Sequence, residues 1–168
     1  VNVIYYNRGN GVLTASSVQQ LADCCPNLIG LKDGKGDIQA LNKIIKTVGG
    51  RLTYIGGVPT AEIFAEAYLS IGVNTYSSAV FNFVPDMAVT FYKELRKGNK
   101  EAVKKITNEF FIPFVDLRDN KAGYAVSLIK AGASMIGRPA GNVRAPLTMP
   151  TEDEVRRLEA LISVARNF

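Results

Sequence analysis

Lys32 is the residue whose type and placement could most directly do chemistry. It follows the apolar run 27–31 and precedes the glycine-containing loop 33–37, so it lies where a strand would pass into a loop. A lysine amine that is withdrawn from water becomes a neutral nucleophile toward a ketone, and the protonated imine then draws electrons from the adjacent carbon. By position alone, a lysine that extends from a strand end into solvent is the more ordinary interpretation.

Tyrosine, arginine and hydroxyl side chains follow the ends of the predicted strands and could assist such a lysine. Tyr6 ends the first apolar run, and a phenol beside an imine nitrogen can carry protons during imine formation. Arg8 follows two residues later. The other candidates at strand ends are Gly57, Thr60, Ser77, Ser78 and Asn82. Taken singly, each of these residues is also explained by packing, by a surface charge or by a turn. The lack of a carboxylate pair disfavours a glycosidase.

Composition excludes several classes of site. The 168-residue chain contains no histidine, which removes Ser-His-Asp and Cys-His machinery and the commonest metal ligand. Cys24 and Cys25 are the only cysteines, a poor disulfide pair and too few for a metal site, so we expect a cytoplasmic setting and no metal. The net charge of +5 is spread without long runs, and no apolar segment reaches about 20 residues. We therefore expect neither nucleic-acid nor membrane binding.

Strand and helix patterns alternate through the first half of the chain. Apolar, β-branched runs and helical periodicity predict strands at 1–6, 27–32, 51–57 and 73–78 and helices at 14–25, 38–48 and 60–71. Asp37 and Thr60 are expected to cap the second and third helices. Strands that alternate with helices build a parallel sheet with right-handed crossovers, and chemistry in such folds gathers at the carboxyl ends of the strands.

The rest of the chain is predicted to be helical. Helices are expected at 84–97, at 100–111 with Pro113 ending it, at 120–134, and from Thr151, whose spacing to Glu154 suits a capping box. No Gly-x-Gly-x-x-Gly or Gly-Lys-Ser/Thr motif follows a strand, so no nucleotide site is expected. Four strand–helix units are half of a (β/α)8 TIM barrel. We expect an α/β fold in which 1–98 form about strands 5 to 8 of a barrel and 99–168 a carboxyl-terminal helical extension.

Several segments carry a resemblance to a known family. The runs YYNR, GLKDGKGD, YIGGVPTAE and GVNTYSSAVFNFVP, followed by GYAVSLIKAG and GNVRAPL, are similar in kind and order to the 5-dehydro-4-deoxyglucarate dehydratases. That family belongs to the dihydrodipicolinate synthase and N-acetylneuraminate lyase superfamily of Schiff-base barrels. The GLKD segment marks only the superfamily, whereas GGVPTAE and TYSSAVFNF are much more specific and point to the dehydratases. The resemblance runs over nearly the whole chain and corresponds to the carboxyl-terminal half of the family's barrel.

The resemblance implies roles for most of the strand-end residues. Lys32 is then the imine-forming lysine and Tyr6 its proton relay, with Tyr5 as the alternative because strand alternation lets only one of the pair face the barrel interior. Arg8 matches a position that meets the substrate's distal carboxylate. The candidates for holding the rest of the substrate are Gly57, Thr60, Ser77, Ser78 and Asn82. No cofactor is implied, because a lysine imine is itself an electron sink.

The implied activity converts a keto-diacid, 5-dehydro-4-deoxy-D-glucarate, into 2,5-dioxopentanoate, water and carbon dioxide in sugar-diacid catabolism. The Gly-Thr-Thr-Gly-Glu-like loop that holds the keto-acid carboxylate in such families is not found in the sequence. We therefore expect the amino-terminal half of the barrel to come from elsewhere, and the superfamily implies a homo-oligomer, either a tetramer or a dimer. Three alternatives remain: a pyruvate-dependent aldolase or synthase of the same superfamily, a non-catalytic barrel-derived binding protein, and a structural oligomerisation module.

Overall fold

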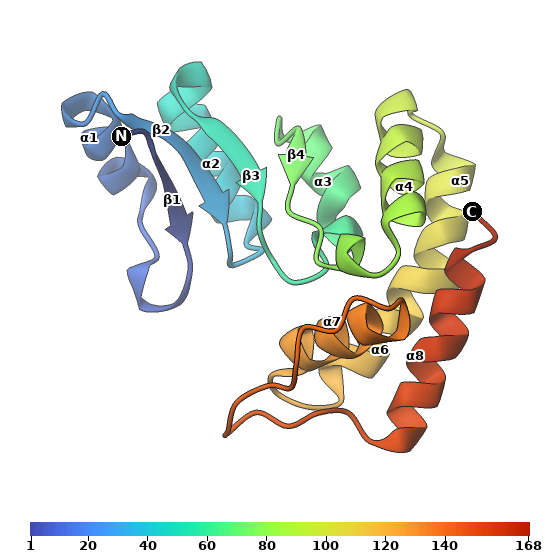
Figure 1. The fold of residues 1–168 in the computed structure, drawn as a ribbon. Coiled ribbons are helices and arrows are strands. Elements are labelled where there is room, and N and C mark those ends of the chain that lie inside the picture. Colours follow the sequence, from blue (N-terminus) through green and yellow to red (C-terminus); the bar gives the residue numbers. More distant parts are fainter. The chain divides into compact units, whose positions relative to one another are not determined.

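Four parallel strands lie side by side in chain order and form the sheet that carries Lys32 (Figure 1). Their bounds are β1 Val3–Asn7, β2 Leu28–Asp33, β3 Thr53–Gly56 and β4 Thr75–Tyr76. All four predicted strands are present, in the predicted parallel arrangement. The third strand starts later than predicted because Gly49–Arg51 form a 3₁₀ turn, η2, directly before it.

The register of the sheet places Tyr6 and Lys32 directly opposite each other. Tyr6 of β1 pairs with Lys32 of β2, which in turn pairs with Ile55 of β3. Because side chains alternate between the two faces of a strand, this row shares one face of the sheet. The next row, which includes Asn7 and Asp33, points to the opposite face.

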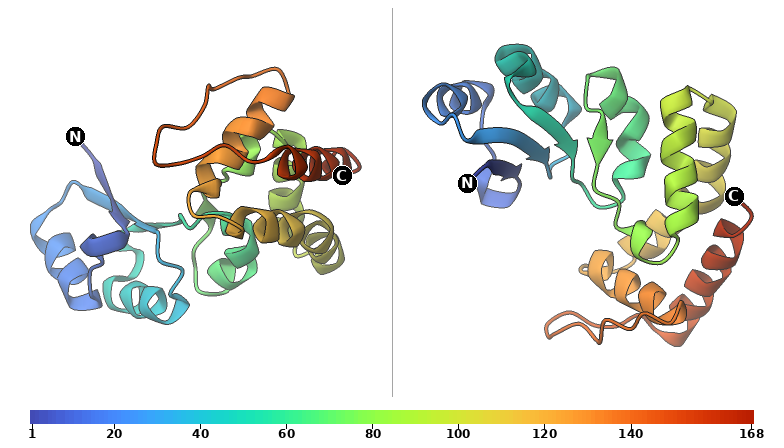
Figure 2. Two further views of the ribbon diagram at one scale, coloured as in Figure 1. Left: turned by 90° about the horizontal axis from the view of Figure 1, so that it is seen from below. Right: turned by 45° about the horizontal axis from the view of Figure 1, so that its top comes forward.

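Three helices of the first unit follow the first three strands. They are α1 Ala15–Cys24, α2 Ile38–Val48 and α3 Ala65–Ser70. In Figures 1 and 2, α1 and α2 lie together against one face of the sheet. The buried core lies between these helices and the strands, and it contains Val18, Ala22, Leu28, Leu31, Leu41, Ile44, Val48, Leu52, Tyr54, Val58, Ala61, Tyr68 and Val73. The row of Lys32 and Tyr6 is on the face away from this core.

Of the two helix caps predicted in this unit, Asp37 is present and Thr60 is not, and Thr14 provides a further cap at the start of α1. The Thr14 hydroxyl accepts a hydrogen bond from the Ser17 N–H, and the Asp37 carboxylate accepts one from the Ala40 N–H. The prediction that Thr60 caps the third helix is wrong. Thr60 adopts a left-handed conformation and makes no side-chain cap, and a 3₁₀ turn, η3 (Ala61–Phe64), comes before α3.

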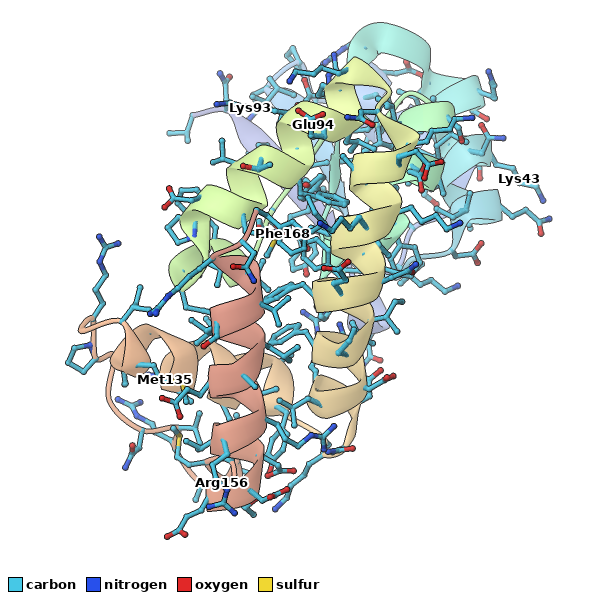
Figure 3. All side chains as sticks on the ribbon, turned by 90° about the vertical axis from the view of Figure 1, so that its right-hand side faces the viewer. Lys43, Lys93, Glu94, Met135, Arg156 and Phe168 are labelled. Atoms are coloured by element: carbon cyan, nitrogen blue, oxygen red, sulfur yellow. The ribbon has the colours of Figure 1, made fainter.

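The second unit is helical, as predicted, and is built around aromatic side chains (Figure 3). Its helices are η4 Val80–Asn82, α4 Pro85–Lys97, α5 Lys100–Ile106, the π-helical turn η5 Thr107–Phe111, α6 Ile112–Asp119, α7 Tyr124–Met135 and α8 Glu152–Ala165. The rings of Phe91 and Phe111 meet edge to face at 4.8 Å, and Phe110 stacks on Phe114 at 5.9 Å. All four rings are fully buried, so they form the centre of this unit.

Pro113 does not end the helix that begins at Lys100, contrary to the prediction. The chain stays helical from α5 through η5 into α6 and ends at Asp119. In η5 the Ile112 N–H reaches back to the Thr107 carbonyl oxygen. Pro113 then falls in the first turn of α6, where a missing N–H costs little.

The predicted capping box at the start of α8 is present. The Thr151 hydroxyl accepts from the Glu154 N–H, and the Glu154 carboxylate accepts from the Thr151 N–H at 2.9 Å. The same carboxylate accepts a 2.7 Å hydrogen bond from the Tyr124 hydroxyl of α7. These donors, Tyr124 first, lower the pKa of Glu154 to about 2. The start of α8 is thereby tied to α7.

The chain divides into two units, Val1–Ser77 and Ser78–Phe168, each with its own core. All of residues 1–168 are described by this computed structural model. The division at residue 98 between a barrel half and a helical extension stays a prediction. No helix has both the length and the apolar character needed to span a bilayer.

Candidate active site

Lys32 and Tyr6 form the centre of the candidate site. The Lys32 Nζ lies 4.7 Å from the centroid of the Tyr6 ring, a cation–π distance. Both side chains come from adjacent strands at the same level of the sheet, so their proximity follows from the backbone register. The predicted pairing of a strand-end lysine with a phenol is therefore present in the geometry.

The Tyr6 hydroxyl is held from two sides. It donates a 2.7 Å hydrogen bond to the Gly57 carbonyl oxygen beyond β3, and it accepts one of 3.2 Å from Arg8 Nη1. The Arg8 guanidinium carbon is 5.8 Å from the centroid of the same ring. Lys32, Tyr6, Arg8 and Gly57, four of the residues predicted from sequence, thus lie together.

Tyr5 points to the other face of the sheet. Its hydroxyl donates to the Gly11 carbonyl oxygen, and its ring packs against the helix-side core. The alternation of side chains along β1 therefore puts Tyr6, and not Tyr5, beside Lys32.

Two glycines have no side chain where the side chains of Lys32, Tyr6 and Arg8 pass close to the backbone. A Cβ added at Gly57 would lie 2.5 Å from both Cγ and Cε of Lys32. A Cβ at Gly34 would lie 2.6 Å from Cε2 of Tyr6 and 2.8 Å from Cβ of Arg8. All of these distances are far below ordinary carbon–carbon contact, so a side chain at either position would displace the site residues.

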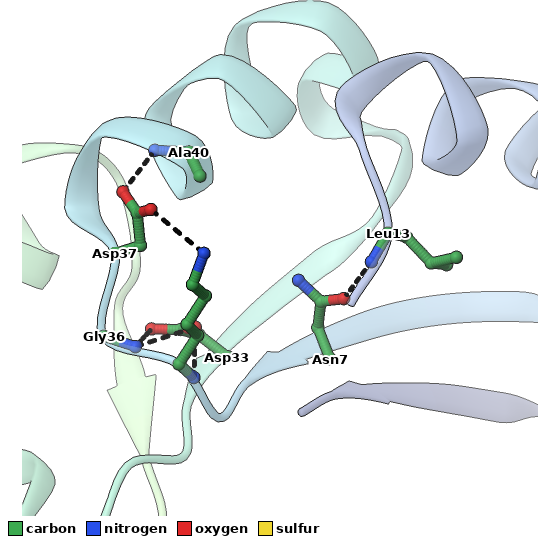
Figure 4. A network of polar contacts seen from close by, with 7 residues as sticks. Asn7, Leu13, Asp33, Gly36, Asp37 and Ala40 are labelled. Carbon is green, nitrogen blue, oxygen red and sulfur yellow. Dashed lines mark hydrogen bonds and ion pairs between the residues drawn. The ribbon is translucent and has the colours of Figure 1, made fainter. Parts of the chain in front are cut away.

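The loop after β2 is organised by two aspartates (Figure 4). The Asp33 carboxylate, only 3% exposed, accepts from the N–H groups of Lys35 and Gly36. Asp37 starts α2 and forms an ion pair of 3.4 Å with Lys35. The Ala40 N–H, together with Lys35, lowers the pKa of Asp37. The loop that follows Lys32 is therefore fixed by its own side chains.

The loop after β1 is held by Asn7. Its side-chain oxygen accepts a 2.7 Å hydrogen bond from the Leu13 N–H, and Asn7 itself is buried (Figure 4). Arg8 begins this loop in extended conformation, with the short 3₁₀ helix η1 (Gly9–Gly11) after it. The position of Arg8 beside Tyr6 thus depends on a loop whose ends are both fixed.

Thr60 and Ser77 lie beyond the ends of the third and fourth strands. Thr60 is 2% exposed and is the one non-glycine residue with a positive φ, 53°. A β-branched residue rarely adopts this conformation, and such strain clusters at functional sites. The Ser77 N–H donates to the Gly56 carbonyl oxygen at 2.9 Å, so the chain after β4 stays tied to β3.

Ser78 and Asn82 belong to the second unit and serve a local turn there. The Ser78 hydroxyl accepts from the Phe81 N–H at 3.3 Å, and the Asn82 side-chain amide donates to the Ala79 carbonyl oxygen at 2.9 Å. Both contacts stabilise η4. A site shared by these two residues with Lys32 stays a prediction.

Sequence reasoning missed the partner of Asp33. The Tyr68 hydroxyl donates a 2.7 Å hydrogen bond to the Asp33 carboxylate, within the core of the first unit. An aspartate followed by Gly-Lys-Gly does signal a carboxylate that caps its own turn, but it does not name a partner 35 residues away. No group of three or more carboxylates, thiols or imidazoles gathers to hold a metal ion.

A family model, the dihydrodipicolinate synthetase family, matches residues 1–165. A probable 5-dehydro-4-deoxyglucarate dehydratase of Allorhizobium ampelinum is 57% identical over 160 residues, covering 95% of this chain and 53% of the relative. A probable 5-dehydro-4-deoxyglucarate dehydratase of Rhodococcus jostii is 54% identical over 162 residues, covering 96% of this chain and 53% of the relative. The resemblance read from the sequence is thereby confirmed.

Solved structures give the same result for the fold. Dihydrodipicolinate synthase of Oceanobacillus iheyensis superimposes with a TM-score of 0.83 at 25% identity, covering 100% of this chain and 55% of that one. The N-acetylneuraminate lyase of Proteus mirabilis, at 19% identity, shares the fold with a TM-score of 0.75. The chain spans about half the length of the curated relatives it matches, and the expectation of about half a TIM barrel is confirmed. The chain belongs to the dihydrodipicolinate synthetase family.

Proposed function

We propose that this chain carries the imine-forming lysine of a decarboxylating dehydratase that acts on 5-dehydro-4-deoxy-D-glucarate. The observation that carries the proposal is the placement of the Lys32 amine against the Tyr6 ring, with the Tyr6 hydroxyl anchored on Gly57. The choice of substrate rests on the likeness to relatives that are probable dehydratases of this keto-diacid. The products are 2,5-dioxopentanoate, water and carbon dioxide.

The first step is condensation of Lys32 with the substrate ketone. The amine adds to the carbonyl carbon, and loss of the carbonyl oxygen as water leaves a protonated imine. A proton must reach that oxygen and another must leave the nitrogen. The Tyr6 hydroxyl is the group beside Lys32 that can exchange both, because it already donates to one partner and accepts from another.

The next two steps use the imine as an electron sink. Removal of a proton from the methylene beside the imine gives an enamine, which expels the hydroxyl on the following carbon as water. The resulting iminium is conjugated to a new double bond. The bond to the far carboxylate then breaks, its electron pair flows into the conjugated iminium, and carbon dioxide leaves. Reprotonation and hydrolysis release the product and restore the Lys32 amine.

The substrate carries a carboxylate at each end, and we assign Arg8 to the far one. Its guanidinium lies beside Tyr6, at the edge of the sheet where Lys32 also emerges. Gly57, Thr60 and Ser77, with Ser78 and Asn82 from the second unit, are the proposed contacts for hydroxyls and carboxylate oxygens. The lysine imine supplies the electron sink, so the proposed reaction needs no metal and no organic cofactor.

The carboxylate beside the ketone also needs hydrogen-bond donors, and the Gly-Thr-Thr-Gly-Glu-like loop that would supply them is not found in this sequence. We propose that they lie in the part of the barrel that completes this half, and that the protein works as a homo-oligomer, a dimer or a tetramer. A cytoplasmic location would suit both the free thiols of Cys24 and Cys25 and a small metabolite as substrate.

A pyruvate-dependent lyase is the second candidate, because two dihydrodipicolinate synthases share this fold and are 25% and 26% identical to this chain in sequence. The two are separated by a turnover assay on this chain and on this chain joined to the part of the Allorhizobium relative that it does not cover. Release of carbon dioxide and 2,5-dioxopentanoate from the keto-diacid supports the dehydratase. Condensation of pyruvate with members of an aldehyde panel, without turnover of the keto-diacid, would overturn it.

A further inference from the structure

We infer that Tyr68 and Asp33 act as a positioning pair that sets the orientation of Tyr6 over Lys32. This inference rests on the proposed function, in which Tyr6 carries protons to and from the Lys32 imine. Neither residue is assigned to contact the substrate. The pair acts from the helix side of the sheet, through the turn that follows β2.

The Asp33 carboxylate fixes the turn after β2 by accepting hydrogen bonds from its backbone N–H groups. One carboxylate oxygen accepts from the Lys35 N–H at 3.0 Å and the Gly36 N–H at 3.3 Å, and the other accepts from the Gly36 N–H at 3.1 Å. Charge-assisted hydrogen bonds of this kind are stronger than neutral ones, and a buried carboxylate depends on them. The backbone of 34–36 is thereby fixed to the strand that carries Lys32.

Tyr68 in turn fixes the Asp33 carboxylate. The Tyr68 hydroxyl donates at 2.7 Å to the carboxylate oxygen that also accepts from Gly36, and Tyr68 is 1% exposed. Burial first, and then the Asp33 carboxylate, raise the pKa of Tyr68, so the phenol remains a donor at all ordinary pH values. Gly56 makes this geometry possible, because a Cβ there would lie 2.6 Å from Cε2 of Tyr68.

Gly34 connects the turn to the candidate site. Gly34 begins the turn, its N–H donates to the Asn7 carbonyl oxygen at 3.1 Å, and its α-carbon packs so closely on Tyr6 and Arg8 that no Cβ would fit. A shift of this turn would therefore move the Tyr6 ring. The contacts run without a gap from Tyr68 through Asp33 and the turn to Tyr6, whose ring faces the Lys32 amine.

The test compares two tyrosines of the first unit, each losing only a hydroxyl. Tyr68→Phe removes the donor to Asp33. Tyr54→Phe is the matched control, because Tyr54 is also buried (7% exposed) and its hydroxyl donates at 2.9 Å to the Gly49 carbonyl oxygen, at the other end of β3. Both variants are made in this chain and in the chain joined to the uncovered part of the Allorhizobium relative.

The first readout is the rate of borohydride-trappable imine formation with the keto-diacid. We expect Tyr68→Phe to slow it by about tenfold to a hundredfold, since small misplacements of a reacting group have costs of this size, with little change in the half-saturating substrate concentration. Asp33→Asn should have a similar effect, and the double variant should be no slower than either single one, because the two residues act as one unit.

The second readout is the NMR spectrum of ring-labelled tyrosine together with the amide signals of Lys35 and Gly36, which needs no turnover. Tyr68→Phe should shift the Tyr6 ring and both amides, and Tyr54→Phe should leave them in place. If the wild-type protein traps no substrate, the proposed function fails. The NMR spectra alone then test whether Tyr68 and Asp33 set the orientation of Tyr6. A Tyr6 signal or an imine rate that responds equally little to both variants would overturn the inference.

Discussion

The side chain of Lys32 crosses the backbone of Gly57 so closely that a Cβ at Gly57 would lie 2.5 Å from two of its carbons. The carbonyl oxygen of the same glycine accepts the hydrogen bond of Tyr6. One residue without a side chain therefore sets the position of both proposed reacting groups, by leaving room for the amine and by anchoring the phenol.

Gly57→Ala is expected to displace Lys32. The added methyl would also lie 2.6 Å from the Asp33 carbonyl oxygen, so the strand ends must separate. Overpacking of this kind costs about 1–3 kcal/mol of unfolding free energy, and the imine rate should fall by at least about tenfold. Denaturant unfolding and borohydride trapping measure the two effects.

Gly50→Ala is the matched control for that change. Gly50 has no heavy atom within 4 Å of an added Cβ, so the same methyl group meets open space. Its imine rate should equal that of the wild-type protein. Equal rates in the Gly57 and Gly50 variants would show that Lys32 does not depend on the space above Gly57.

Tyr6→Phe is expected to slow imine formation while the fold is retained. The ring still packs on Gly34, but the hydroxyl that bonds Gly57 and Arg8 is gone. General acid–base groups contribute about 10²- to 10⁴-fold, so a loss within that range is expected. Single-turnover trapping measures it, with Tyr5→Phe as the comparison because Tyr5 lies on the opposite face. A larger loss in the Tyr5 variant would reverse the assignment.

The capping box of α8 predicts a pH-dependent stability in the second unit. The pKa of Glu154 is lowered from 4.5 to about 2 in the folded chain, so the unfolded chain binds more protons between these values. The stabilisation is complete above about pH 4.5 and is lost as the pH falls toward 2. Glu154→Gln should therefore lower the unfolding free energy at pH 7 and have a much smaller effect near pH 2.

Chemical unfolding at several pH values measures this difference. Glu159→Gln, an exposed carboxylate on the same helix, is the control and should change the stability equally little throughout. A Glu154 variant whose loss of stability is the same at pH 7 and at pH 2 would contradict the assigned role of the carboxylate.

The features that were predictable from the sequence are those that depend on neighbours in the chain. Alternation gave the two faces of β1, and the residue types at helix starts gave the caps at Asp37 and Thr151. The placement of Lys32 at the end of β2 followed from the apolar run before it.

Features that depend on distant neighbours were not predictable in this way. Thr60 reads as a cap by type, but the chain turns there in a left-handed conformation. The Asp33–Tyr68 bond joins residues that are 35 positions apart, and neither residue carries a local signal for the other. Pro113 reads as a helix end, yet a π-helical turn before it carries the helix onward.

The assignment of Lys32 as the imine-forming residue is tested most directly by borohydride trapping with the keto-diacid, read by intact mass and then by peptide mapping. It should be done on this chain and on the chain joined to the uncovered part of the Allorhizobium relative. We predict one adduct, on Lys32, that is lost in Lys32→Arg and kept in Lys35→Arg. An adduct on Lys35, or no adduct in the joined chain, would contradict the assignment of Lys32 as the imine-forming residue.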